Sequence, residues 1–324
     1  MARRLSRACG DGPSPVARGR DRCILELAST IQESLDGALA EIAHEVFGFA
    51  SASMAKLEAA LLPADATCSV ADAFAARVQV CPRVSADDAQ ALRSLLGGTG
   101  LRVFLQPLLR LSDGALIGFE ALARGPAGST LETADRLFGI ARRCGLEPAL
   151  ELACINAALA WRDRLPAELL LSINVSARTL ALPTVVERLA RPGILVELTE
   201  RLPLNRVGEL APLLARLRQA GARLALDDAG CGFADLQAAQ AMRPDVVKLC
   251  ITIVNALGRQ PALLEELRTT VAMLHGLGCE VLAEGIETRE MAEILDELGI
   301  DYGQGWFYGR PALASLMLAS YQSA

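Results

Sequence analysis

The amino-acid sequence predicts an α/β barrel whose chemistry lies at the carboxyl ends of its strands. Seven short apolar runs each close on a carboxylate, an amide or a lysine, and helical patterns separate most of them. One such run could arise by chance, whereas seven in series indicate strands that open onto a common face. The closing residues are Glu120, Asn174, Glu197, Asp227 with Asp228, Lys248, Glu284 and Gln304.

The segment before the barrel carries no chemical motif. Residues 1–22 are basic and rich in Gly, Pro and Ser, which predicts a disordered tail. Residues 23–98 are expected to form a helical region, because apolar residues recur at three- and four-residue steps from Cys23 to about Leu62 and a short helix is expected at 86–96, with an irregular stretch at 63–85 between them. Their apolar stripe either packs on the barrel or pairs with a second copy of the chain. We therefore expect a tail at 1–22, a helical extension at 23–98 and the barrel at 99–324.

The barrel elements are expected in order from Leu101. Strands at 101–111 and 115–123 form a hairpin around Ser112-Asp113-Gly114, and one helical stretch follows over 131–162. The later strands are expected at 168–175, 194–198, 223–228, 245–250, 280–284 and 302–308. Three glycines stand just before strands, where a helix C-cap is expected: Gly221, Gly278 and Gly299.

Composition excludes several classes of function. The chain has 324 residues, 52 % of them apolar, and a net charge of −6, so a large core is available and nucleic acid is not expected as a partner. Two histidines, His44 and His275, are too few for a His-rich zinc site and argue against a Ser-His-Asp triad. Nine cysteines without a CxxC pair and no secretory signal predict a cytoplasmic protein with reduced thiols. No apolar run approaches the roughly 20 residues of a transmembrane segment.

The acids outnumber what general acid–base catalysis needs, which indicates metal ions. Carboxylates gathered at one face repel one another, and divalent cations relieve that repulsion. Oxygen ligands without His or Cys favour Mg²⁺ or Mn²⁺, and the amide oxygen of Asn174 suits the same ions. The adjacent Asp227 and Asp228 suit two bridged ions, the arrangement that cleaves phosphodiesters. Lys248 then orients the attacking water or neutralises a phosphate.

These residues also carry a resemblance to a known family. From about residue 101 to 315, roughly two thirds of the chain, the sequence resembles the EAL-type cyclic-di-GMP phosphodiesterases, and Glu120-Ala121-Leu122 matches the signature. One tripeptide is a weak signal, but the ordered set of motifs is specific. The set comprises QP at Gln106, Arg124 in EALAR, NVS at Asn174, ELTE at 197–200, DDAGCG at 227–232, VVKL at Lys248, AEGIET at 283–288 and QGWFYGRP at 304–311.

The resemblance implies a modified (β/α)₈ barrel that hydrolyses cyclic di-GMP to linear pGpG with two Mg²⁺ or Mn²⁺ ions, often as a homodimer. The implied metal ligands are Glu120, Asn174, Glu197, Asp227, Asp228 and Glu284. The implied catalytic residues are Glu120, Asp227 and Glu284 with Lys248, which would assist the attacking water. The implied substrate contacts are Gln106, Arg124, Asp228 and Gln304. Glu200 would anchor the loop after Asp228, and Glu287 would be a secondary site residue.

Departures from the family pattern leave a second function open. The loop usually written DDFGxGYSS reads DDAGCGFAD at 227–235, and the usual Lys-x-Asp reads Lys248-Leu249-Cys250. The stretch from Asn174 to Glu197 is also shorter than usual, and the usual YQP is LQP, with Leu105. The chain is therefore either a phosphodiesterase, weakened by these changes, or a degenerate EAL domain that acts as a cyclic-di-GMP receptor or protein-interaction regulator. A third alternative is a regulator that binds neither nucleotide nor metal.

Overall fold

The computed structural model describes residues 84–98, 100–198, 204–229, 233–257 and 261–322. The chain divides into two units, Met1–Arg83 and Val84–Ala324, and the second unit carries the barrel. The predicted tail, most of the predicted helical extension and Glu200 lie outside the described residues.

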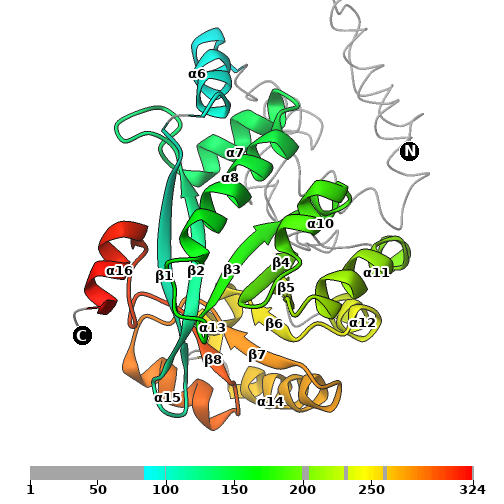
Figure 1. Ribbon diagram of the computed structural model, residues 1–324. Helices are drawn as coiled ribbons and strands as arrows, with labels where there is room; N and C mark the ends of the chain where they lie inside the picture. Colours follow the sequence, from blue (N-terminus) through cyan, green and yellow to red (C-terminus); the bar gives the residue numbers. More distant parts are fainter. Residues whose placement is uncertain (1–83, 99, 199–203, 230–232, 258–260, 323–324) are drawn as a thin grey trace, which may run out of the picture. The chain divides into compact units, whose positions relative to one another are not determined.

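The predicted barrel is confirmed, and its first strand runs against the others (Figure 1). Strands β2 to β8 are parallel and follow one another in sequence order, while β1 pairs antiparallel with both β2 and β8 and closes the ring. A short β9 also pairs antiparallel with β1, at Phe104 and Leu105, whereas β8 pairs with β1 at Leu109 and Arg110. The strands are β1 Arg102–Arg110, β2 Leu116–Arg124, β3 Leu170–Val175, β4 Ile194–Leu198, β5 Arg223–Ala229, β6 Val246–Leu249, β7 Glu280–Ala283, β8 Tyr302–Gly303 and β9 Ala312–Leu313.

Helices connect the strands and surround the barrel (Figure 1). Those described are α6 Ala86–Leu96, α7 Ala134–Arg143, α8 Glu147–Arg162, α9 Ala177–Leu180, α10 Pro183–Leu189, α11 Leu204–Gln219, α12 Phe233–Met242, α13 Ile251–Leu257, α14 Pro261–Gly276, α15 Arg289–Glu297 and α16 Ala314–Gln322. Between β3 and β4 only the short α9 and α10 intervene, which accounts for the short stretch between Asn174 and Glu197.

Two expected elements were wrong in detail. The single helix expected over 131–162 is two helices, because Gly145 adopts a positive φ of 68° that ends α7 before α8 begins. The strand expected over 302–308 is only Tyr302–Gly303, since the chain then turns toward Ile286. The three glycines expected at helix ends have the positive φ of that role: 85° at Gly221, 81° at Gly278 and 82° at Gly299.

Alternation along the strands divides the barrel interior into layers. An inner apolar layer is formed by Leu108, Leu195, Ala225, Val246, Leu282 and Tyr302. Side chains two positions apart on a strand share a face. We can therefore move two positions from each residue of this layer, toward the carboxyl end in the parallel strands and toward the amino end in antiparallel β1. The residues at those positions are Gln106, Glu197, Asp227, Lys248, Glu284 and Gln304. The inner apolar layer therefore lies directly beneath the residues singled out in the sequence.

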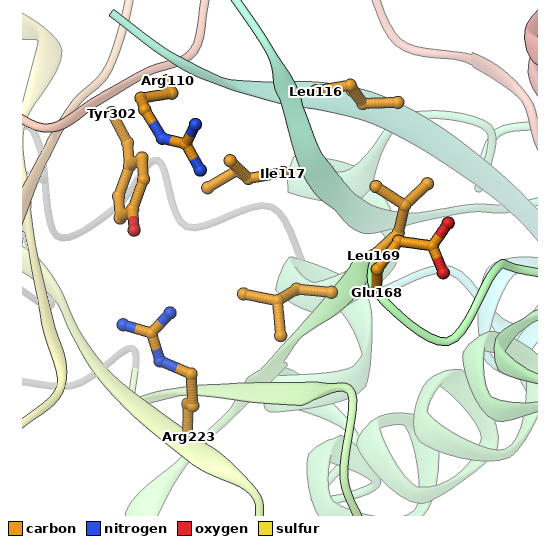
Figure 2. Close-up of a pocket in the computed structure, with 8 residues that line it drawn as sticks. Arg110, Leu116, Ile117, Glu168, Leu169, Arg223 and Tyr302 are labelled. Carbon is orange, nitrogen blue, oxygen red and sulfur yellow. The ribbon is translucent and has the colours of Figure 1, made fainter. Parts of the chain in front are cut away.

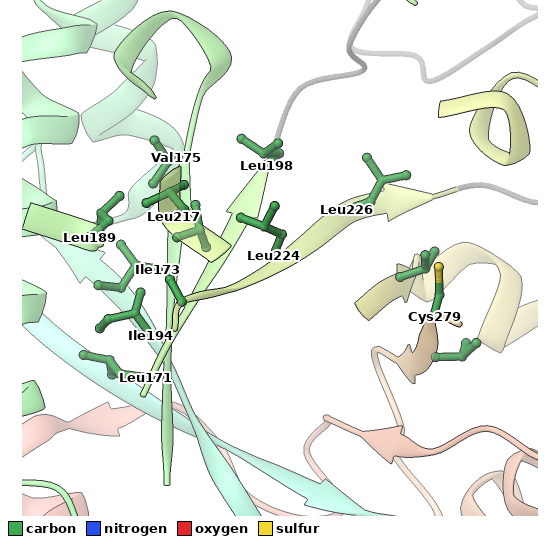
Figure 3. Close-up of a cluster of buried hydrophobic side chains, with 14 of the residues drawn as sticks. Leu171, Ile173, Val175, Leu189, Ile194, Leu198, Leu217, Leu224, Leu226 and Cys279 are labelled. Atoms are coloured by element: carbon green, nitrogen blue, oxygen red, sulfur yellow. The ribbon is translucent and has the colours of Figure 1, made fainter. Parts of the chain in front are cut away.

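The intervening strand residues face outward and form the main core with the helices. Leu171, Ile173 and Val175 of β3 lie beside Leu189 of α10 and Leu217 of α11 (Figure 3). These side chains are almost fully excluded from solvent. Burial of this apolar surface holds the helices on the barrel.

Helix α6 belongs to the barrel unit. Its Leu92 and Leu95 are buried against Leu137 and Ile140 of α7 and Leu150 of α8. The compact unit consequently starts at Val84, ahead of the boundary expected between 98 and 99. Among the described helices, none is long and apolar enough to cross a bilayer. The four described cysteines, Cys144, Cys154, Cys250 and Cys279, are free thiols.

Candidate active site

Residues from six barrel strands, and from the segments that directly follow two more, meet at the carboxyl end of the barrel. Glu120 of β2 lies opposite Gln106 of β1 in the antiparallel register. Asn174 of β3 lies beside Glu197 of β4 in the parallel register. Asp227 lies in β5 and Lys248 in β6, while Glu284 and Gln304 come directly after β7 and β8. The fold thus gathers residues that are up to 198 positions apart.

The ammonium group of Lys248 lies among four carboxylates. Its Nζ is 2.7 Å from Glu284 Oε1, 2.8 Å from Glu197 Oε2, 3.1 Å from Asp227 Oδ1 and 4.0 Å from Glu120 Oε2. The Lys248 side chain is 1 % exposed, and burial alone would lower its pKa. The attraction of the surrounding carboxylates outweighs burial and raises the pKa of Lys248 well above its usual value. Lys248 is therefore charged.

One ammonium cannot offset four carboxylates. Burial raises the pKa of Glu197 well above its usual value, against the attraction of Lys248, and raises the pKa of Glu284 to about 7. Asp227 Oδ1, although 3.1 Å from Lys248 Nζ, is not aligned with it for a hydrogen bond and has no other partner among the described residues. The cluster therefore has capacity for further protons or further cations.

Ser172 fixes the Glu197 carboxylate and was not singled out from the sequence. Its hydroxyl donates to Glu197 Oε1 at 2.5 Å, while Lys248 donates to Oε2 at 2.8 Å. Ser172 and Glu197 are both fully buried. The signal was present in the strand pattern, because Ser172 lies two residues before Asn174 and so shares its face.

Two glutamines and an asparagine complete the floor of the site. Gln304 Nε2 donates to Glu120 Oε2 at 2.6 Å and to Gln106 Oε1 at 3.0 Å. Asn174 Nδ2 donates to Glu120 Oε1 at 2.8 Å, so both oxygens of this carboxylate are held. The backbone after Gln304 passes close to Ile286, because a Cβ at Gly305 would lie 2.0 Å from the Ile286 carbonyl oxygen. Gln304 Oε1 is buried and has no partner among the described residues.

Four further residues singled out in the sequence lie in or shortly after β2, β5, β6 and β7. Arg124 ends β2, donates to the Ala123 carbonyl at 2.8 Å and lies 5.8 Å from the centre of the Phe104 ring. Glu287 is exposed between β7 and α15. Asp228 occupies the position after Asp227 in β5. The thiol of Cys250 lies 2.7 Å from the Thr252 hydroxyl.

The carboxylate and amide oxygens of the cluster suit a hard cation. In this structure the ammonium group of Lys248 supplies the positive charge among them. Among the described residues, no group of three or more His, Cys, Asp and Glu side chains is arranged as a metal site. Asn174 would add an amide oxygen to the carboxylates, beside Glu197 in the parallel register. The buried Asp227 Oδ1 and Gln304 Oε1 remain without hydrogen-bond partners, and oxygen donors of this kind bind Mg²⁺ and Mn²⁺. The residues present therefore fit such an ion.

The fold and the cluster define a class of protein: an α/β barrel with one antiparallel strand and an ionic site of carboxylates, amides and a lysine at its carboxyl end. The family described as EAL domain matches residues 89–311. The chain belongs to this family.

Similar proteins are known from several bacteria. The probable cyclic di-GMP phosphodiesterase PdeB of Escherichia coli K12 is 31 % identical over 237 residues, which cover 68 % of this chain and 44 % of PdeB. Klebsiella pneumoniae BlrP1, solved as a manganese and cyclic di-GMP complex, is 28 % identical with a TM-score of 0.60, covering 67 % of this chain and 57 % of BlrP1. An EAL domain protein of Listeria monocytogenes EGD-e shares the fold, with a TM-score of 0.66, 23 % identity and coverage of 75 % and 100 %. The chain spans less than half the length of the first curated relatives that it matches.

Proposed function

We propose that this chain hydrolyses cyclic di-GMP to linear pGpG with the help of two Mg²⁺ or Mn²⁺ ions, and so lowers this second messenger in bacterial signalling. The observation that carries the proposal is the cluster of four carboxylates around Lys248 at the carboxyl end of an EAL-family barrel. The names of PdeB and of the BlrP1 complex support the substrate and the metal.

The residues that would hold the ions are Glu120, Asn174, Glu197, Asp227, Asp228 and Glu284. Rotation of the Asn174 amide would present its oxygen instead of the nitrogen that now donates to Glu120. When bound, divalent ions supply charge stabilisation for the phosphodiester and make an attacking water more acidic.

The residues of the chain itself would bind and orient the reactants. Lys248 keeps its proton on Nζ, because the surrounding carboxylates raise its pKa, and it can donate a hydrogen bond that orients the attacking water. Gln304 holds Glu120 and also donates to Gln106, and both glutamines would contact the substrate. Arg124 at the end of β2 would pair with a phosphate oxygen, the contact that a guanidinium fork favours. Burial raises the pKa of Glu284 to about 7 without metal, so Glu284 would give up its proton when it binds an ion.

Cys250 favours the alternative of a receptor or protein-interaction regulator with little turnover. It stands two residues after Lys248, where the family pattern has an aspartate, and its thiol lies within hydrogen-bonding distance of the Thr252 hydroxyl. One carboxylate fewer near the cluster would weaken the hold on metal. A homodimer and a cytoplasmic location stay predictions, and light scattering during gel filtration would test the first.

The deciding experiment is hydrolysis of cyclic di-GMP by the purified chain with Mg²⁺ or Mn²⁺, followed by chromatography of the product. Glu120→Gln removes one charge from the cluster and should abolish product. Glu147→Gln is the matched control, because Glu147 pairs with Arg142 at the surface, away from the strands that carry the cluster. Linear product from the wild type and the control supports the enzyme. Nucleotide binding without product would support the receptor.

A further inference from the structure

The amino end of the barrel, opposite the ionic cluster, is also lined by charged residues. Arg223 and Glu280 are the first residues of β5 and β7, and Arg110 is the last residue of antiparallel β1. Each lies two positions from a member of the inner apolar layer, on the side away from the cluster. The inner apolar layer therefore separates two polar ends, and the second has no part in the proposed hydrolysis.

This end holds a cavity of about 340 Å³. Arg110, Arg223 and Tyr302 line one side of it, and Leu116, Ile117 and Leu169 supply apolar surface (Figure 2). The guanidinium groups of Arg110 and Arg223 point toward the same space, whereas the carboxylate of Glu168 lies on the other side of the cavity (Figure 2). The volume is at the lower end of the range typical of small-molecule pockets.

Glu280 positions two of the lining groups. Its Oε2 accepts from Arg223 Nη2, and its Oε1 accepts from the Tyr302 hydroxyl at 2.8 Å. This contact joins β5, β7 and β8. Arg110 takes no part in it: among the described residues its guanidinium bonds only to Asp113, at 2.9 Å, with both side chains about half exposed. Such a surface ion pair contributes little and yields readily to another anion.

We propose that this cavity binds a small organic anion, with a carboxylate or phosphate group between Arg110 and Arg223 and an apolar body against Leu116 and Ile117. Guanidinium groups present paired N–H donors that match the oxygens of both anions. The inner apolar layer, which includes Tyr302, closes the inner end of the site. The proposal does not depend on hydrolysis of cyclic di-GMP.

Phenyl phosphate, which joins a phosphate to a small apolar ring, is the probe for calorimetric titration of the whole chain in EDTA. Saturable binding to the wild type is expected, with inorganic phosphate weaker because it lacks the apolar body. Arg110→Gln should weaken phenyl phosphate binding about 10-fold, the effect of losing one charged hydrogen-bonding partner. Arg268→Gln is the matched control, since Arg268 is a half-exposed arginine of α14 that pairs with Glu265.

Three results would overturn the proposal. The first is the absence of saturable binding at millimolar probe. The second is equal affinity of the wild type and Arg110→Gln. The third is loss of binding in Arg124→Gln instead, which would place the probe at the opposite end of the barrel. None of these results bears on cyclic di-GMP hydrolysis, so the two proposals stand or fall separately.

Discussion

Replacing Lys248 with methionine should destabilise the metal-free protein strongly and in a pH-dependent way. Lys248→Met keeps most of the side-chain stem and removes the ammonium that lies 2.7, 2.8 and 3.1 Å from oxygens of Glu284, Glu197 and Asp227. Removing one partner of a buried ion pair costs about 3–5 kcal/mol, because the other charge is left uncompensated. Glu197 is 0 % exposed, so we expect a loss of about this size at pH 8 in EDTA.

Acid should relieve the loss. In the wild type the folded-state pKa of Glu284 is raised from 4.5 to about 7, chiefly by burial, and the pKa of Glu197 is raised as well. Groups with raised folded pKa values stabilise the fold while they are protonated, and lose that contribution as the pH rises from about 4.5 through about 7. Without the ammonium these pKa values rise further. At pH 5 the carboxyl groups of the variant are then neutral, and the difference from the wild type shrinks.

Urea denaturation followed by circular dichroism at pH 5 and pH 8, in EDTA, measures both effects. Arg268→Met is the control, because it removes a surface cation from α14. Mn²⁺ should recover part of the loss at pH 8, since a cation then offsets the carboxylates. An equal loss at the two pH values, or wild-type stability at pH 8, would refute the electrostatic account of the cluster.

Three further changes test other parts of the argument. Ser172→Ala removes the hydroxyl that donates to Glu197 at 2.5 Å; it should weaken Mn²⁺ binding about 10-fold, as for other residues that orient metal ligands, whereas unchanged affinity in a calorimetric titration would contradict this role. Cys250→Asp restores the acid of the family pattern and should raise the rate of cyclic di-GMP hydrolysis, with Cys250→Ser as control; equal rates in the two variants would show that Cys250 does not limit turnover. Gly118→Ala would bring a Cβ to 2.3 Å from the Leu170 carbonyl oxygen and should lower the free energy of unfolding by about 1–3 kcal/mol; a wild-type denaturation midpoint would mean that β2 and β3 separate easily.

The sequence predicted the barrel and the position of its site because both follow from local patterns. An apolar run that ends in Glu197 or Lys248 indicates which residue lies at the end of a strand. Closure of the barrel then brings the strand ends together. The hairpin and the glycines at helix ends were predictable for the same reason, since a turn or a cap depends on a few neighbouring residues.

Contacts between strands could not be predicted in the same way. The hydrogen bond from Ser172 to Glu197 depends on the register of β3 against β4. A local sequence pattern does not predict that register. The break between α7 and α8 was missed because one glycine is compatible with a helix, and only the positive φ of Gly145 ends it. Arg110 and Arg223 meet the same cavity because β1 runs antiparallel, an arrangement that depends on closure of the whole sheet.

Closure by the first strand also constrains when the site can form during protein synthesis. Gln304 contacts Glu120 and Gln106, which precede it by 184 and 198 residues, and Gln106 donates to the carbonyl of Gly309, 203 residues later. A growing chain therefore cannot complete this site until nearly all of the barrel has left the ribosome. A nascent chain that stops before residue 304 carries all the acids of the site but lacks Gln304, whose amide holds Glu120.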